Sequence, residues 1–202
     1  MKGVLGSNAI RQMLENGELI VTPLLDLNRQ IGRASLDVRL GQDFVLFRKG
    51  QIPVMDVKGS LGNASWADYY DHIRAEYGQP FILHPGQFVL SSTLEFLRLP
   101  RNVMAYVIGR SSWGRAGLVI ATATFVDPGF QGVITLELVN EGEVPLSLYP
   151  GTRIAQLVFH QLEEEVQPYK GKYAFDSKAT ASRADEDEEI AKLTRNDHEK
   201  WA

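Results

Sequence analysis

The chain has 202 residues, of which 44% are hydrophobic, and a net charge of −4. This length predicts one domain with appended segments, and the acidic balance does not favour a nucleic-acid partner. Cysteine is absent, which excludes a disulfide scaffold and the zinc site of the common nucleobase deaminases, because that site needs cysteine ligands. No apolar run reaches the ~20 residues of a membrane span and no signal peptide is recognised, so a cytoplasmic protein without a membrane partner is expected.

The first elements predicted are a short helix and a strand. Residues 7–16 place apolar side chains at helical spacing, with Ser7 or Asn8 as the expected N-terminal cap. Gly17 is expected to end this helix, since glycine favours the position after a helix C-terminus. Residues 18–23 (ELIVTP) then read as a strand that ends at its proline.

From residue 35 the pattern changes to short strands. Residues 35–48 (SLDVRLGQDFVLFR) open by alternating, with Asp37 and Arg39 opposite an apolar face, and a structural role is expected for both. Residues 61–78 interrupt the pattern as a polar and aromatic insertion with one or two helical turns. Turn signals recur at Lys49-Gly50, Gly59, Pro85-Gly86, Pro100, Pro128-Gly129, Glu141-Gly142 and Pro150-Gly151. Many short strands separated by such turns are typical of an all-β sandwich or barrel.

Residues 109–118 (GRSSWGRAGL) carry the first candidate binding residues. Arg110, Ser111, Ser112 and Arg115 could present guanidinium groups, hydroxyls and backbone N–H groups to one anion, as a phosphate requires. The alternative is a surface turn whose serines cap a short helix. The pattern alone leaves both open, but it excludes a P-loop because the Gly-Lys-Ser spacing is missing.

Residues 126–140 (VDPGFQGVITLELVN) place a carboxylate within a predicted strand. Glu137 shares a face with Thr135 and Val139, while the leucines on either side of it point the other way. Asp127 belongs to the Asp-Pro-Gly turn and is most often a turn-former in such a sequence. Glu137 is therefore either an incidental charge on a half-buried strand or a functional group.

Two other polar residues invite structural interpretations. Gln156 lies in a predicted strand on the same face as Ile154 and Val158, where a polar group satisfied at a strand edge is the plainer interpretation. His84 precedes a Pro-Gly turn and is expected to be a turn residue. The four histidines are scattered along the sequence, so no metal site built by the protein is predicted.

Six segments together resemble the dCTP deaminase family of the trimeric dUTPase-like superfamily. In chain order they are ASLDVRLG, FILHPGQFVLSSTLEFLRLP, GRSSWGRAGL, VDPGFQGVITLELVN, LYPGTRIAQLVF and GKYAFDSKATASR. The resemblance implies a mainly β fold, a distorted β-barrel or jelly-roll with a short N-terminal helix and a C-terminal arm. It also implies a homotrimer with nucleotide sites between subunits. Residues 1–183 would form the domain, with 164–183 as an arm closing the site, and 184–202 would be an acidic tail.

The resemblance implies zinc-independent hydrolytic deamination of dCTP to dUTP and ammonia. Alternatives are a dUTP diphosphohydrolase, a bifunctional enzyme yielding dUMP, and a non-catalytic nucleotide-binding regulator. Mg²⁺ would arrive with the nucleotide triphosphate. The catalytic residues implied are Glu137, which activates water, Arg115 and Ser111. The nucleotide-binding residues implied are Arg110, Ser111, Ser112, Asp127, Gln156, Tyr169, Lys172 and Tyr173.

Two segments differ from the family pattern. Residues 119–126 (VIATATFV) are one residue shorter than usual and lack a histidine, although Thr122-Ala123 is kept. Asp176 in the arm stands where the family usually has glutamine, and its carboxylate would repel a triphosphate unless Mg²⁺ or a shifted arm intervenes.

Overall fold

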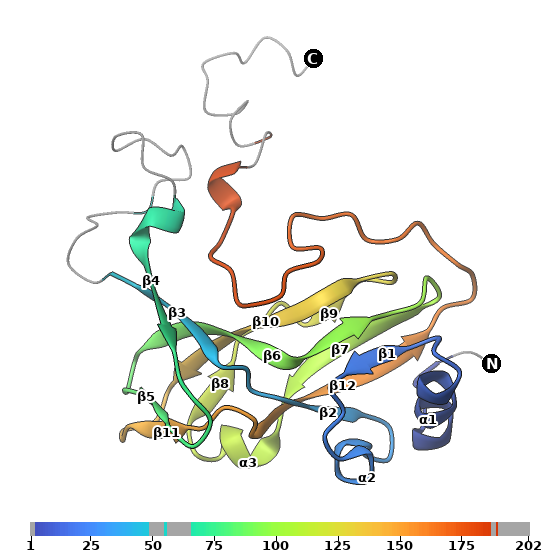
Figure 1. Ribbon diagram of the computed structural model, residues 1–202, viewed down its shortest axis with the longest axis horizontal. Helices are drawn as coiled ribbons and strands as arrows, with labels where there is room; N and C mark the ends of the chain where they lie inside the picture. The colour runs from blue at the N-terminus through green and yellow to red at the C-terminus, as the bar shows by residue number, and fades with distance from the viewer. Residues whose placement is uncertain (1–2, 49–54, 56–65, 187–188, 190–202) are drawn as a thin grey trace.

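The computed structural model describes residues 3–48, 55, 66–186 and 189 (Figure 1). Among these residues the strands form three antiparallel sheets, which confirms the predicted mainly β class. The six-stranded sheet has the order β4 (Tyr70–Arg74), β3 (Asp43–Phe47), β6 (Phe88–Arg98), β10 (Gln131–Asn140) and β8 (Leu118–Ile120), and β1 (Ile20–Thr22) also pairs with β6. The four-stranded sheet has the order β2 (Leu36–Arg39), β12 (Arg153–Gln161), β7 (Val103–Gly109) and β9 (Phe125–Val126), and the third sheet pairs β11 (Leu146–Leu148) with β5 (Phe81–Leu83).

The helices are short (Figure 1). They are α1 (Ser7–Glu15), α2 (Leu27–Gln30), α3 (Ser111–Gly114) and the 3₁₀ turns η1 (Trp66–Tyr69) and η2 (Ala184–Glu186). Within the described ranges, no helix combines the length and apolar character that crossing a membrane requires.

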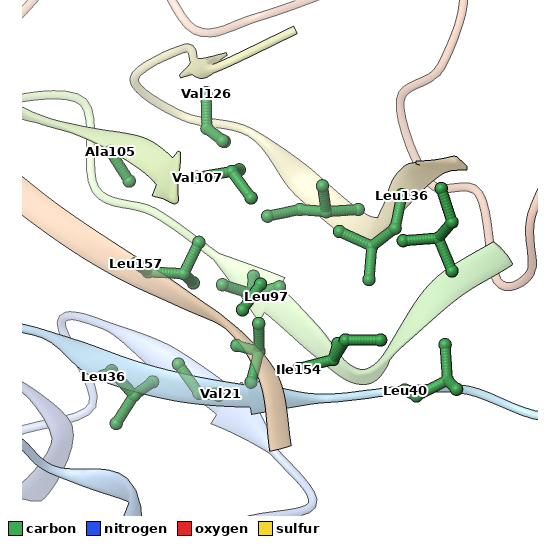
Figure 2. Packing of buried hydrophobic residues seen from close by; sticks show 14 of the residues in the cluster. Val21, Leu36, Leu40, Leu97, Ala105, Val107, Val126, Leu136, Ile154 and Leu157 are labelled. Carbon is green, nitrogen blue, oxygen red and sulfur yellow. The ribbon is translucent and has the colours of Figure 1, made fainter. Parts of the chain in front are cut away.

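One hydrophobic core joins the two larger sheets. Leu97 and Leu136 on the six-stranded sheet face Leu157 and Val107 on the four-stranded sheet (Figure 2). Leu97, Leu136 and Leu157 are fully buried. Burying one such side chain contributes about 1.5–3 kcal/mol, so this layer accounts for much of the driving force that holds the sheets together.

The N-terminal helix agrees with its predicted range but not with its predicted cap. Gly6 occupies the cap position and no side chain caps it, so the expectation of Ser7 or Asn8 as the cap was wrong. The backbone N–H of Ser7 instead donates to the carbonyl of Arg33 at 2.8 Å. Gly17 has φ +70°, a conformation that favours glycine, and the prediction that it ends the helix region is confirmed.

The strand that carries Gln156 departs from the predicted face pattern. A register shift lies between Arg153 and Ala155 on β12, so Ile154 is fully buried while Gln156 and Val158 are half-buried on the other side. β12 also lies between β2 and β7, so Gln156 is on a central strand rather than at an edge. A bulge shifts the two-residue period by one, which is why alternation placed Ile154 on the wrong face.

The prediction that residues 61–78 interrupt the strands was wrong for Tyr70–Arg74, which form β4 of the six-stranded sheet. Residues 66–69 form the 3₁₀ turn η1, as a helical turn was expected, and β4 pairs with β3 along its whole length. Residues 61–65 lie outside the described residues.

The chain after β12 returns over the start of β10 (Figure 1). Val133 donates its backbone N–H to the carbonyl of Asp176 at 2.9 Å, and Phe175 donates to Gln131 at 2.7 Å. Gly132 has φ +149°, and a Cβ there would lie 3.2 Å from the Asp176 carbonyl oxygen, so glycine permits this close approach. Most of the predicted tail, residues 187–188 and 190–202, lies outside the described residues.

Candidate active site

β10 presents Glu137 on the face opposite the core. Leu136 and Leu138 are fully buried against the other sheet, whereas Thr135, Glu137 and Val139 are half-buried. The face assignment made from alternation is thereby confirmed. Glu137 has Leu90 of β6 as its direct cross-strand partner.

Glu137 and Thr135 line a pocket of about 440 Å³, called here the Glu137 pocket. Its floor is formed by β10, β6 and β3, one wall by residues 122–127, and its cover by the arm, residues 164–183. Asp127 and Tyr169 also line it, as does Tyr173. Three of the predicted nucleotide-binding residues therefore meet the predicted catalytic glutamate in one place.

The backbone beside Glu137 holds the neighbouring wall in place. Its N–H donates to the Thr122 hydroxyl at 2.8 Å, and its carbonyl accepts from the N–H of Ala121 at 2.8 Å. These bonds fix the Thr122-Ala123 pair, which the resemblance singled out, next to the carboxylate.

Burial raises the pKa of the Glu137 carboxyl above its ordinary value. A carboxyl with a raised pKa is a stronger base when it is ionised, and it is protonated more readily. That property suits a group that must both accept and donate a proton in one reaction.

A second polar cluster is organised by the buried carboxylate of Asp37. Asp37 accepts hydrogen bonds from Gln156 Nε2 and Arg153 Nη1, both at 2.9 Å, and pairs with Arg110 Nε at 3.4 Å. Only 5% of Asp37 is exposed, so the charge is compensated by these partners rather than by water. Two predicted nucleotide-binding residues, Arg110 and Gln156, are thus fixed by one carboxylate, which confirms the structural role expected for Asp37.

The short helix α3 is attached to β12 beside this cluster. Arg110 Nη1 and Trp113 Nε1 both donate to the carbonyl of Arg153, at 3.2 and 3.0 Å. Arg110 is itself the N-cap and no side chain caps the helix, so the alternative of serine capping was wrong. Ser111, Ser112 and Arg115 are exposed. Exposed hydroxyl and guanidinium groups on a fixed turn are available to an anion.

The structure does not bring Ser111 and Arg115 to Glu137 within one chain. Neither residue lines the Glu137 pocket, although both were predicted to act beside its carboxylate. Figure 1 shows the reason, since α3 and the arm lie on opposite sides of the fold. The predicted catalytic residues are therefore divided between two regions of the chain.

The arm is closed on itself by Arg183. Its guanidinium pairs with Asp176 at 3.6 Å, donates to the carbonyl of Lys172 and lies 5.7 Å from the centre of the Tyr173 ring. Thr180 donates its hydroxyl to Asp176 at 2.8 Å. The charge of Asp176, which departs from the family pattern, is thus compensated inside the arm.

Sequence reasoning missed the roles of Arg153 and Arg183. Both lie in segments that carried the family resemblance, but neither stood out by spacing.

The turn roles of Asp127 and His84 are confirmed, because their carbonyls accept the N–H groups of Phe130 and Gln87 at 3.1 and 3.0 Å. Across the described part of the chain, no three His, Asp or Glu side chains gather where they could hold a metal ion.

Comparison with known proteins agrees with this geometry. Residues 4–162 match the family described as dCTP deaminase-like. The chain is 41% identical over 183 residues to a "dCTP deaminase, dUMP-forming" of Persephonella marina, which covers 89% of this chain and 96% of the relative. It is 38% identical over 196 residues to a protein of the same name from Methanobrevibacter smithii (94% and 99% covered), and 41% identical over 193 residues to a "dCTP deaminase" of Halorubrum lacusprofundi (93% and 94% covered).

A solved structure shows the same fold. The 2'-deoxycytidine 5'-triphosphate deaminase from Agrobacterium tumefaciens superposes with a TM-score of 0.62 at 24% identity, over 79% of this chain. The match spans 48% of that longer chain. The dUTPase-like fold class expected from the sequence is confirmed, and so is the expectation of an enzyme family. The chain belongs to the dCTP deaminase-like family.

Proposed function

We propose that the protein deaminates dCTP hydrolytically to dUTP and ammonia. The observation that carries the proposal is Glu137, a half-buried carboxyl of raised pKa on the floor of a 440 Å³ pocket. Relatives about 40% identical over most of their length bear the name dCTP deaminase.

Glu137 supplies the proton transfers that deamination needs. It takes a proton from water as the oxygen adds to C4 of cytosine, and it delivers that proton to N3. It then takes the proton of the new C4 hydroxyl and delivers it to the amino group, which leaves as ammonia as the C4 carbonyl forms. The base becomes uracil without a change in oxidation state. Asp127, at the turn that opens β10, lies at the sugar end of the same pocket in this arrangement.

The nucleotide site is completed between subunits of a homotrimer. Arg110, Ser111, Ser112 and Gln156 of one subunit bind the phosphates, which arrive with Mg²⁺ as part of the substrate. Arg115 and Ser111 of that subunit then reach Glu137 of a neighbouring subunit. Two observations support this arrangement: α3 is exposed and lies on the side of the fold opposite the arm (Figure 1), and neither Ser111 nor Arg115 lines the Glu137 pocket.

The arm covers the nucleotide in this proposal. Tyr169 and Tyr173 already line the pocket, and Lys172 lies on the same segment. A closed arm keeps bulk water from the reacting base, which strengthens the electrostatic interactions inside.

A bifunctional reaction that ends at dUMP is the second candidate. It is favoured by the names of the relatives from Persephonella marina and Methanobrevibacter smithii, both "dUMP-forming". In that case Asp127 orients a water molecule that attacks phosphorus, while Glu137 serves the base.

One assay separates these outcomes. The protein is incubated with dCTP or dUTP and Mg²⁺, and ammonia, pyrophosphate and nucleotides are followed. Ammonia without pyrophosphate supports the deaminase, and both products from dCTP support the bifunctional enzyme. Pyrophosphate from dUTP without ammonia from dCTP would indicate a diphosphohydrolase. Binding without turnover of either nucleotide would indicate a regulator.

The rate of deamination is expected to fall in acid around a pKa above the ordinary glutamate value of 4.5. The general base must be ionised before it accepts a proton from water, and burial raises the pH at which Glu137 ionises. The pH dependence of kcat/KM for dCTP measures this limb. A rate that stays constant down to pH 4.5 would contradict the assignment.

Mixed trimers test whether sites are shared between subunits. Arg115→Ala and Glu137→Gln are each expected to lose at least about two orders of magnitude in activity when pure. Co-expressed in equal amounts, they should recover about one quarter of wild-type activity, because random assortment leaves that fraction of shared sites with both residues intact.

The matched control replaces the Arg115→Ala partner by the double variant Arg115→Ala/Glu137→Gln. No site in those trimers has both residues, so activity should stay at the level of the pure variants. Equal recovery with both partners, or none with either, would rule out a site that combines Arg115 of one subunit with Glu137 of another.

A further inference from the structure

Besides Glu137, the lining of the Glu137 pocket includes a group of apolar and aromatic side chains from β6, β3 and β4. Leu90 on β6 lies directly across from Glu137, and Phe88, at the start of the same strand, lies across from Val139. The ring of Phe47 on β3 lies 6.1 Å from that of Phe88 and 4.5 Å from that of Tyr70 on β4, measured between ring centres. All four residues line the pocket.

The arm encloses this apolar region. Ala179 is fully buried against Leu90 and Tyr70, and Ala181 packs at the edge of the same cluster while lining the pocket. The arm therefore forms part of the wall of this region.

The order of strands in the sheet decides which edge of the base meets this region. If the sugar lies by Asp127 and C4 by Glu137, the N1–C4 axis of cytosine runs along β10. The two lateral edges of the ring then face the two neighbours of β10, which are β8 on one side and β6 on the other. The chain that follows β8 brings Thr122 against the Glu137 backbone.

The polar and apolar edges of cytosine match these two sides. O2 and N3 form the hydrogen-bonding edge, and they belong beside the polar backbone of the Thr122-Ala123 wall. C5 and C6 carry only hydrogen, and they belong beside Leu90 and the aromatic rings. The reverse orientation would place O2 and N3 against apolar groups that cannot donate to them, which costs free energy.

We propose that Leu90, Phe88, Phe47 and Tyr70 form a subsite for an apolar substituent at C5, so that the enzyme also deaminates 5-methyl-2'-deoxycytidine triphosphate. The proposal rests on the proposed deamination and extends its substrate class. Water adds at C4 and ammonia leaves as before, and the product is the 5-methyl-2'-deoxyuridine triphosphate. A methyl group placed in this region is removed from water, which favours binding.

The test compares kcat/KM for 5-methyl-dCTP and dCTP. The wild-type ratio is expected to lie within about threefold of unity or above it. Leu90→Phe fills the space beside C5 and should lower this ratio by about tenfold or more, the usual penalty for an unaccommodated methyl group. Ala181→Leu fills the same space from the arm and should lower it independently. Leu25→Phe, a size-matched change at an exposed residue outside the pocket, should leave it unchanged.

The subsite and the proposed function fail in different ways. A wild-type ratio below about one tenth, or filling variants that leave the ratio unchanged, would overturn the subsite while deamination stands. Absence of turnover with both nucleotides would overturn the function. In that event calorimetry measures the affinities of the wild type and the same variants for 5-methyl-dCTP and dCTP. The ratio of these two affinities then tests the subsite, with the same expected values as the ratio of kcat/KM.

Discussion

Replacing Glu137 by glutamine is expected to lower the rate of deamination by about two to four orders of magnitude, the usual contribution of a general acid–base group. The amide has nearly the same shape as the carboxylate but cannot accept a proton from water. Because the side chain is only half-buried and its backbone makes the bonds that hold Ala121 and Thr122, the pocket should keep its shape. Ammonia release measures the rate, and calorimetry with dCTP measures binding, which should be retained.

Glu141→Gln is the matched control for this experiment. Glu141 follows the same strand but is exposed and does not line the Glu137 pocket, so the same change of charge should leave the rate near the wild-type value. If Glu137→Gln retained more than about one tenth of the wild-type rate, Glu137 could not be the general base.

The second large effect concerns stability and comes from Glu95, a fully buried residue of β6 outside the Glu137 pocket. Its carboxylate accepts from Gln30 Nε2 at 2.9 Å and from the backbone N–H of Arg39 at 2.8 Å. Burial outweighs these bonds and raises the pKa of Glu95 to about 7 from 4.5.

Raising the pH from about 5 to about 8 is expected to lower the free energy of unfolding through Glu95 by on the order of 3 kcal/mol. The raised pKa means that the folded protein binds the proton more tightly than the unfolded chain. Stability from this group is therefore greatest below pH 4.5 and is lost progressively until the pH exceeds about 7. Urea unfolding monitored by circular dichroism at a series of pH values measures the loss.

Glu95→Gln isolates this contribution, because glutamine does not titrate. The variant should be less stable than the wild type at low pH, because an amide has only one oxygen that can accept hydrogen bonds from Gln30 and Arg39. Its stability should also depend less on pH than that of the wild type. Glu143→Gln, at an exposed position, should keep the wild-type dependence. Equal slopes for wild type and Glu95→Gln would show that Glu95 does not titrate in this range. Glu137 shifts in the same direction but is present in all three proteins, so it cancels in the comparison.

Local features of the fold followed from local sequence. The side of β10 on which Glu137 lies follows from a two-residue period, and the turn at Asp127 follows from the Asp-Pro-Gly sequence itself. The end of the first helix region at Gly17 is likewise a property of one residue. None of these needs a partner from elsewhere in the chain.

Predictions failed where a distant segment supplied the partner. The first N–H group of the first helix donates to the carbonyl of Arg33, and no serine side chain caps the helix. The bulge near Ile154 turns that side chain into the core, whereas alternation in a regular strand would place it on the face of Gln156. Asp37 meets Arg153 and Gln156 from 116 and 119 residues away. No window of sequence contains such a pair.

The sequence by itself determined that this is a mainly β member of the dCTP deaminase-like family, with Glu137 on the open face of its strand. Periodicity, turn chemistry and ordered motifs are written along the chain, so they can be read from it. Only the tertiary structure decided that Asp37 fixes Arg110 and Gln156, that Arg183 compensates Asp176, and that Arg115 lies apart from Glu137. These are relations between segments far apart in sequence, and packing of the sheets determines them.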